Sequence, residues 1–170
     1  MKKLETLLKD YAEHVAKRAT KGIPPLPLNA EQTNCVTQLL EQKTNNESEY
    51  LLDLLVNRVP PGVDEAAYVK ASWLTAIVNG EKHCKFINAQ KAIQILGTMI
   101  GGYNVNSLIE ILKSKDNLLA KEAAQVLKNI ILVYDAANDI FDLSQNNIYA
   151  KEVINSWANA EWFTTKNSLP

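Results

Sequence analysis

Apolar residues recur three and four positions apart along most of this 170-residue chain, and short polar or proline–glycine segments separate them. That spacing puts the apolar side chains on one face of a helix, whereas a half-buried strand needs strict alternation. No stretch shows convincing alternation bounded by turn residues. The sequence therefore predicts an all-α fold of about eight or nine helices with short connections.

Start and stop signals divide the first half of the chain into four helical stretches. Asn29 with Gln32 forms a capping-box pattern, and Asp64 followed by Glu65 suits the positive end of a helix. The expected helices are Leu4–Ala19, a helix after Asn29 that buries Val36, Leu39 and Leu40, Glu49–Val59, and a helix from Asp64 to Gly80 that buries Ala67, Ala71, Trp73, Leu74, Ile77 and Val78.

Prolines shape two of the connections. "GIPPLPL" (Gly22–Leu28) rules out a helix and favours a stiff, extended segment. A rigid linker within the domain is the favoured interpretation, and a ligand for a small recognition domain is the alternative. Pro60, Pro61 and Gly62 form a tight corner, which we expect to set the crossing of two packed helices.

Five further helices are expected in the second half. Asn88, Asn104 and Asp116 are the predicted caps of the first three, with "GGYN" turning the chain before Asn104. The long run after Asp116 should contain two helices that meet near Tyr134–Asp135. The last helix is expected over Tyr149–Phe163, with Val153, Ile154 and Trp157 in the core.

Helices at this spacing pair into hairpins, and stacked hairpins of about 40 residues resemble a HEAT-like solenoid. Identity between the repeats is weak, so a compact, irregular HEAT-like stack of antiparallel hairpins fits better than a long superhelix.

Charge and composition restrict the partners. The 18 basic and 19 acidic side chains leave a net charge of −1, which disfavours nucleic acid and anionic membranes. Basic residues do outnumber acidic ones among the first 21, and a solvated helix face is the favoured explanation. No secretory leader and no apolar run of about 18 residues is visible, so we expect a cytoplasmic protein with reduced thiols.

Few residues suggest chemistry. Cys35 and Cys84 cannot supply the three or four thiolates that an iron–sulfur cluster usually takes. His83 beside Cys84 lacks further ligands at zinc spacing, and His14 has no second histidine placed near it. We expect an exposed His83 in a surface loop, an unremarkable thiol at Cys84, and a surface position for His14. No catalytic residue, cofactor or metal site is predicted in this chain.

Charged pairs are the remaining candidates. Asp135, Asp139 and Asp142 share one helix face, which favours a solvated surface over a weak divalent-cation site. Asp53 with Arg58, and Glu152 with nearby lysines, should form exposed ion pairs of little energetic value. No nucleophilic triad, phosphate-binding loop or metalloprotease helix is present.

Several stretches, in order, resemble one family. They are "AKRATKGIPPLPLNAEQ", "EYLLDLLVNRVPPGVDEAAYVKASWLTAIVNGE", "KAIQILGTMIGGYNVNSLIE", "AKEAAQVLKNIILVYDAANDI" and "YAKEVINSWANAEWF". Together they resemble the amino-terminal domain of bacterial aconitase B, the bifunctional aconitate hydratase 2. The resemblance runs from about Tyr11 to Phe163, and "LLVNRVPPGVDEAAYVKA" and "SWANAEWF" are its most specific parts.

The resemblance implies a HEAT-like helical domain over residues 1–163 and, over 164–170, the start of a linker toward a swivelling domain. Family members interconvert citrate and isocitrate through cis-aconitate in the tricarboxylic acid cycle, with a 4Fe-4S cluster as Lewis acid. The cluster cysteines belong to later domains, so no family catalytic or cluster residue maps onto this chain.

Two functions from different classes follow as expectations. The first is an accessory, protein-interaction domain of an aconitase B, with the remaining aconitase domains as partners and a homo-oligomer as a further possibility. The alternative is an autonomous helical adaptor that binds another protein. An RNA-binding role is disfavoured by the net charge and the lack of a basic stripe. Trp162 and Phe163 are the candidate domain-docking residues, because aromatic side chains dominate buried contact surfaces.

Overall fold

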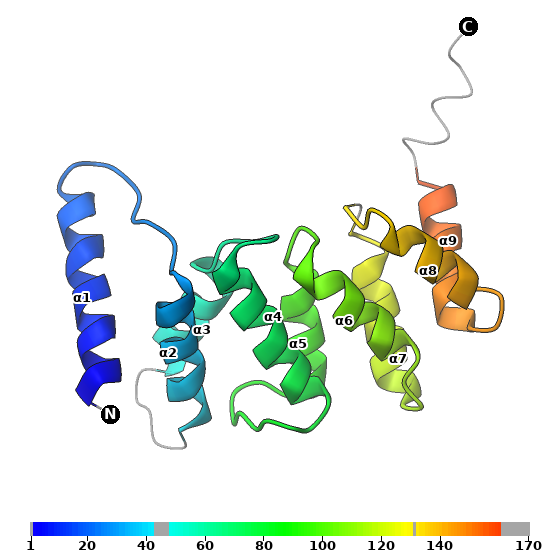
Figure 1. The fold of residues 1–170 in the computed structure, drawn as a ribbon, viewed down its shortest axis with the longest axis horizontal. Helices are drawn as coiled ribbons and strands as arrows, with labels where there is room; N and C mark the ends of the chain where they lie inside the picture. Colours follow the sequence, from blue (N-terminus) through cyan, green and yellow to red (C-terminus); the bar gives the residue numbers. More distant parts are fainter. Residues whose placement is uncertain (1, 43–47, 131, 161–170) are drawn as a thin grey trace, which may run out of the picture.

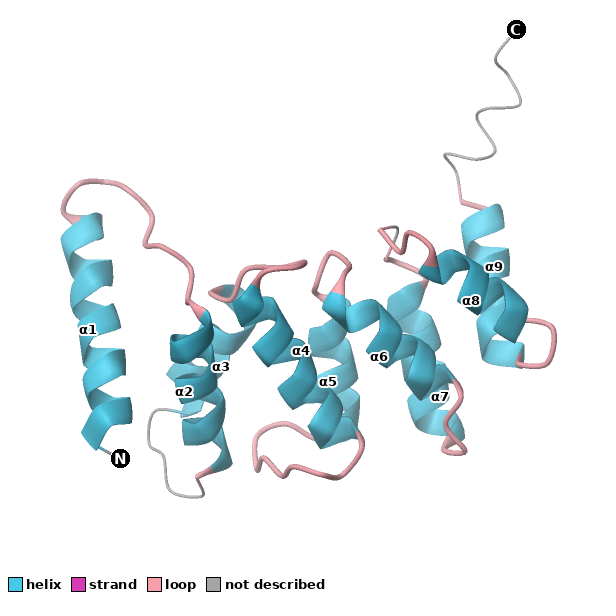
Figure 2. Cartoon of the chain, viewed as in Figure 1, coloured by secondary structure: helices cyan, strands magenta, loops and turns pink. Residues whose placement is uncertain are grey.

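The computed structural model describes residues 2–42, 48–130 and 132–160, and within these ranges the chain forms nine helices and no strand (Figure 2). The predicted all-α fold is confirmed. The helices are α1 (Lys2–Ala19), α2 (Ala30–Glu41), α3 (Ser48–Asn57), α4 (Glu65–Val78), α5 (Ala89–Gly97), α6 (Tyr103–Leu112), α7 (Asn117–Leu127), α8 (Ala136–Leu143) and α9 (Ile148–Ala158).

From α2 onward the helices pack as pairs in two layers (Figure 1). Helices α2, α4, α6 and α8 contact one another in series, and α5, α7 and α9 form the second layer, with α3 paired to α2. Consecutive helices run in opposite directions, so the connections lie alternately along the upper and the lower edge of the stack in Figure 1. Helix α1 contacts α2 at one end of the stack.

Side-chain caps define four of the expected helix starts. Asn29 forms the complete capping box with Gln32, and the side chains of Asp64, Asn88 and Asp116 each accept a backbone N–H of the first turn. These bonds satisfy donors that a helix end otherwise leaves unpaired. Local sequence signals therefore predicted these boundaries correctly.

One continuous core runs through the stack. Its largest fully buried side chains come from seven of the helices and two connections: Leu28, Leu40, Leu51, Leu55, Leu74, Ile87, Ile93, Leu96, Leu108, Leu112, Leu127 and Ile140. Burial of a leucine or isoleucine side chain contributes about 1.5–3 kcal/mol relative to exposure. Val36, Leu39 and the predicted stripe on α4 are also buried, except for Val78, which is partly exposed.

The connection between α5 and α6 differs from the prediction. Asn104 does not cap its own helix, because α6 begins one residue earlier and Gly102 holds the N-cap position. The Asn104 side chain is fully buried and donates from Nδ2 to the Leu96 carbonyl at 2.8 Å. Asn104 therefore closes the carboxyl end of the preceding helix α5, where carbonyl groups lack partners within the helix.

The break between α7 and α8 is longer than predicted. Two helices were expected to meet near Tyr134–Asp135, but α7 already ends at Leu127 and α8 begins at Ala136. Tyr134 has a φ of +48°, which no α-helix accommodates, and Leu132 pairs with Gly101 through an isolated parallel bridge. The segment after α7 is therefore held in a non-helical conformation, with a backbone contact to a residue distant in sequence.

The proline segment is bound to the domain by side chains of helix α1 and of the residue that follows helix α3. Tyr11 donates its hydroxyl to the Leu26 carbonyl at 2.8 Å, and Arg18 donates to Pro24 O at 2.6 Å. Arg58, which follows α3, donates through Nη2 to Pro25 O at 2.7 Å. The predicted Asp53–Arg58 pair is therefore wrong, since Asp53 instead accepts from Asn57. The rigid-linker interpretation gains support from this network.

His14 also takes part, although a surface position was predicted. Its Nε2 accepts the Leu26 N–H at 3.1 Å, and its ring stacks on Tyr11 with centroids 5.9 Å apart. The ring is partly buried as a result. The bond requires the tautomer in which Nδ1 carries the proton.

We expect Arg58→Ala to loosen the proline segment and α1 while leaving the rest of the stack intact. Arg58 also donates from Nε to the Tyr11 hydroxyl oxygen at 3.3 Å. Loss of this bond and of the charged hydrogen bond to Pro25 should lower the free energy of unfolding by about 1–3 kcal/mol. Hydrogen exchange at the Leu26 and Leu28 amides should accelerate, while exchange in α6 stays unchanged. Asp53→Ala is the control. An equal loss of stability in both variants would instead support the predicted Asp53–Arg58 ion pair.

The tryptophans of the two layers differ in burial. Trp73 on α4 is buried and donates from Nε1 to Glu41 of α2 at 2.6 Å. Trp157 on α9 was predicted to be core but is only partly buried, with Nε1 donating to the Leu127 carbonyl at 3.2 Å. Val153 is fully buried and Ile154 partly. The reason is that α9 ends the stack, and in the described structure no further helix pair covers it.

Candidate interaction surfaces

Both cysteines lie in the core. The Cys84 thiol, for which the sequence predicted nothing remarkable, is buried in the connection between α4 and α5 and donates to the Leu40 carbonyl, with sulfur and oxygen 3.3 Å apart. Burial raises the pKa of the Cys35 thiol, and the nearby Glu31 carboxylate raises it further. The Cys35 thiol is therefore a poor nucleophile and a poor metal ligand.

No group of three or more His, Cys, Asp or Glu side chains with metal-binding geometry occurs among the described residues. His83 is exposed, as expected. Asp135, Asp139 and Asp142 are exposed as well, which agrees with a solvated helix face. Glu152 pairs with Lys128 at 3.0 Å, as the sequence suggested. These charges lie on surfaces and converge on no common point in the described chain.

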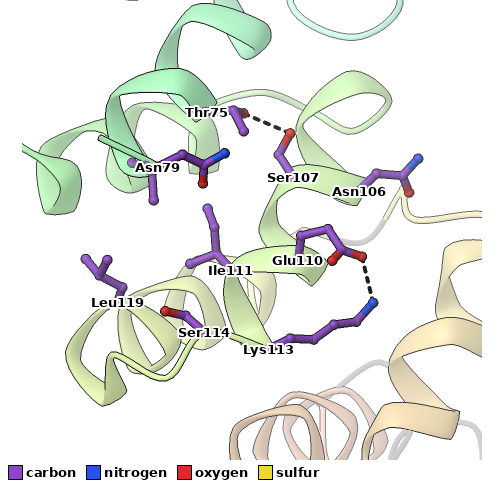
Figure 3. A pocket seen from close by; sticks show the side chains of 10 residues that line it. Thr75, Asn79, Asn106, Ser107, Glu110, Ile111, Lys113, Ser114 and Leu119 are labelled. Carbon is purple, nitrogen blue, oxygen red and sulfur yellow. Dashed lines mark hydrogen bonds and ion pairs between the residues drawn. The ribbon is translucent and has the colours of Figure 1, made fainter. Parts of the chain in front are cut away.

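A groove of about 720 Å³ lies between α4 and α6 and extends to the start of α7 (Figure 3). Thr75 and Ser107 face each other across it, with their hydroxyl oxygens 2.9 Å apart, and Thr75 also donates to Ala71 O. Farther along, Lys113 donates to Glu110 at 2.6 Å. The full lining is Thr75, Val78, Asn79, Asn106, Ser107, Glu110, Ile111, Lys113, Ser114 and Leu119.

This groove lacks the groups that catalysis requires. A serine or threonine nucleophile needs a base within hydrogen-bond reach, and Thr75 and Ser107 bond each other and a backbone carbonyl instead. The one acid in the lining, Glu110, is exposed and paired with Lys113. The groove is therefore a packing boundary between stacked helix pairs, and we call such a boundary a seam. A second seam, of about 550 Å³, follows between α6 and α8.

One buried charge escaped sequence analysis. Lys70 on α4 is only 3% exposed, and its ammonium donates to the carbonyl of Val56 in the last turn of α3 at 3.2 Å. Burial lowers the pKa of Lys70 from 10.5 to about 8. Its spacing from Ala67 and Leu74 follows the apolar stripe, a signal that places it on the buried face. The lysine acts as a C-terminal cap of α3.

We expect this lysine to make stability rise with pH. Between pH 8 and pH 10.5 the unfolded chain keeps the Lys70 proton and the folded chain releases it, so raising the pH favours folding. The gain in the free energy of unfolding should be on the order of 3 kcal/mol across this window. Denaturant unfolding at several pH values measures it. Lys70→Met should remove this contribution and Lys121→Met, at an exposed position, should not; equal slopes in all three proteins would contradict the assignment.

The candidate docking residues Trp162 and Phe163 lie outside the described residues. In the described chain, no helix is long and apolar enough to cross a membrane. The fold and its seams define the class of the molecule: an all-α stack of helix pairs with broad surfaces between and along its elements.

Comparison with known proteins identifies the family. The chain belongs to the family described as the aconitate B N-terminal domain, whose model matches residues 10–163. It is 56% identical over 164 residues to aconitate hydratase B of Synechocystis sp., and 48% identical over 165 and 164 residues to the aconitate hydratase B proteins of Pseudomonas aeruginosa and Escherichia coli. Each match spans 96% of this chain and 19% of the relative.

Proposed function

We propose that this chain is a non-catalytic, HEAT-like accessory domain of an aconitate hydratase B, with protein interaction as its role. Citrate and isocitrate would be interconverted through cis-aconitate by later domains that hold the 4Fe-4S cluster. The observation that carries the proposal is the match to a family of N-terminal domains over only 19% of each relative's length. The described part of this chain also brings no set of metal ligands together.

The proposed partners are the remaining domains of the same enzyme. The polar groups in the grooves between helix pairs bond to one another or to the backbone. Such a rigid stack is better suited to binding another protein than to catalysing a reaction. Trp162 and Phe163 are proposed to help seat the next domain; their replacement by glutamine should weaken binding of a separately made swivelling domain with little change in stability. The two buried thiols are typical of the cytoplasmic location expected from the sequence.

The test compares this chain with the product of the full reading frame, both reconstituted with iron and sulfide without oxygen. We expect only the longer protein to hydrate cis-aconitate and to show the visible absorption of an iron–sulfur cluster. Turnover or a stoichiometric cluster in the 170-residue chain would contradict the proposal. A stop codon directly after Pro170 would favour the autonomous adaptor instead.

A further inference from the structure

The two edges of the helix stack differ in the character of their connections. Those on the upper edge in Figure 1 carry exposed apolar side chains: Ile23 and Leu26 after α1, Val63 after α3, Ile100 after α5, and Leu132 and Tyr134 after α7. Those on the lower edge are largely polar, as in "NGEKHCK" after α4, "KSKD" after α6 and "SQNN" after α8. In stacked repeats, loops of one edge commonly form the binding face.

Three of the upper connections join into one surface. The backbone of Gly102 lies so close to Val63 that a Cβ on the glycine would be 2.9 Å from Val63 Cγ1. The rings of Tyr68 and Tyr103 meet edge to face with centroids 5.1 Å apart. The backbone bridge between Gly101 and Leu132 links the α5–α6 connection to the α7–α8 connection. We name this surface the corner patch; it consists of Val63, Tyr68, Ile100, Tyr103, Leu132 and Tyr134.

The exposure of the corner patch is large for apolar and aromatic side chains. Val63 is 75% exposed and Tyr134 is 78% exposed. Tyr134 is also the one non-glycine residue of the described chain with a positive φ, +48°. A strained backbone that presents an aromatic ring to solvent is typical of a functional surface. Contiguous exposed apolar surface of this kind usually marks a docking site.

The position of α9 indicates what covers the corner patch. Its carboxyl end lies at the same upper edge as the apolar connections (Figure 1). The relatives continue beyond the matched N-terminal domain for most of their length, since the match spans only 19% of them. Chain that follows this domain would therefore start from the edge that carries the patch.

We propose that the corner patch is the docking surface for the polypeptide that follows this domain in an aconitate hydratase B. The inference rests on the proposed function and adds the face of the stack that the later domains bind. The lower edge, whose connections are largely polar, stays in solvent.

Single cysteines test this assignment by their rate of maleimide labelling, read at each position by peptide mass spectrometry. The patch variants are Val63→Cys, Ile100→Cys and Tyr134→Cys. Leu118→Cys and Ile148→Cys are matched controls, because these apolar residues are 54% and 69% exposed at helix starts on the lower edge. Each variant is made both in the 170-residue chain and in the product of the full reading frame.

We expect labelling at the three patch positions to be about tenfold slower or more in the longer protein than in the 170-residue chain. Labelling at the two controls should be the same in both. Equal patch labelling in both proteins would overturn the proposal, as would protection confined to the controls. Protection already present in the 170-residue chain and dependent on its concentration would assign the patch to a second copy.

These outcomes separate the two proposals. Unprotected patch cysteines in a longer protein that hydrates cis-aconitate would overturn the docking surface and leave the proposed function standing. A longer protein without that activity would contradict the proposed function whatever the labelling result.

Discussion

Gly101→Ala should lower the free energy of unfolding by about 3 kcal/mol or more, because two costs combine at this position. The φ of Gly101 is +146°, a conformation that residues with a Cβ rarely adopt. A Cβ built there would also be 2.3 Å from the backbone oxygen of Leu132. That oxygen belongs to the connection between α7 and α8, so the clash would separate two helix pairs as well as strain one residue.

Gly80→Ala is the matched control for this prediction. Gly80 also has a positive φ, +75°, but a Cβ there would meet no atom within 4 Å. Its cost should stay near the strain of a left-handed residue, about 1–2 kcal/mol. Urea unfolding of both variants measures the difference. Equal losses would show that the approach of Gly101 to Leu132 contributes nothing to stability.

Asn104→Asp should cost about 3 kcal/mol near neutral pH, although the two side chains have almost the same shape. The Asn104 amide is fully buried and donates to the carbonyls of Leu96 at 2.8 Å and Met99 at 3.4 Å. A carboxylate would place negative oxygen against these acceptors without water. The Asn104 Oδ1 atom already lacks a partner, so no nearby donor would stabilise the new charge.

Asn106→Asp separates this effect from the general effect of a new charge on α6. Asn106 is exposed and lies one turn inside the same helix. A negative charge near a helix N-terminus is neutral to favourable, by about 0.3–1 kcal/mol. Thermal unfolding of both variants gives the comparison. If both substitutions lower the free energy of unfolding equally, the hydrogen bonds from Asn104 to the carboxyl end of α5 contribute nothing to stability.

The test of the corner patch and these two substitutions concern the same part of the molecule. Gly101, Gly102 and Asn104 hold the connection from which Ile100 and Tyr103 project. A destabilised connection would disturb the patch without changing a residue of it. Cysteine labelling is therefore best done in proteins with these three residues intact.

The all-α class, the caps at Asn29, Asp64, Asn88 and Asp116, and most of the core followed from the sequence, because helical periodicity and capping act over three or four residues. That this chain holds no reactive centre stays a prediction from its cysteines and histidines. The family itself was visible in "LLVNRVPPGVDEAAYVKA" and "SWANAEWF", and the comparisons bear it out.

The tertiary structure decided what depends on contacts between residues distant in the chain. Asn104 has the sequence of a cap for α6, yet its amide closes α5, since only packing shows which carbonyls lie nearby. Arg58 binds a proline carbonyl 33 positions away instead of Asp53 on the helix that precedes it. Helix α7 ends at Leu127 without a breaker, and the corner patch exists only because alternate connections meet along one edge. Local patterns determine helices; the partners of their ends and loops are determined by how the helices stack.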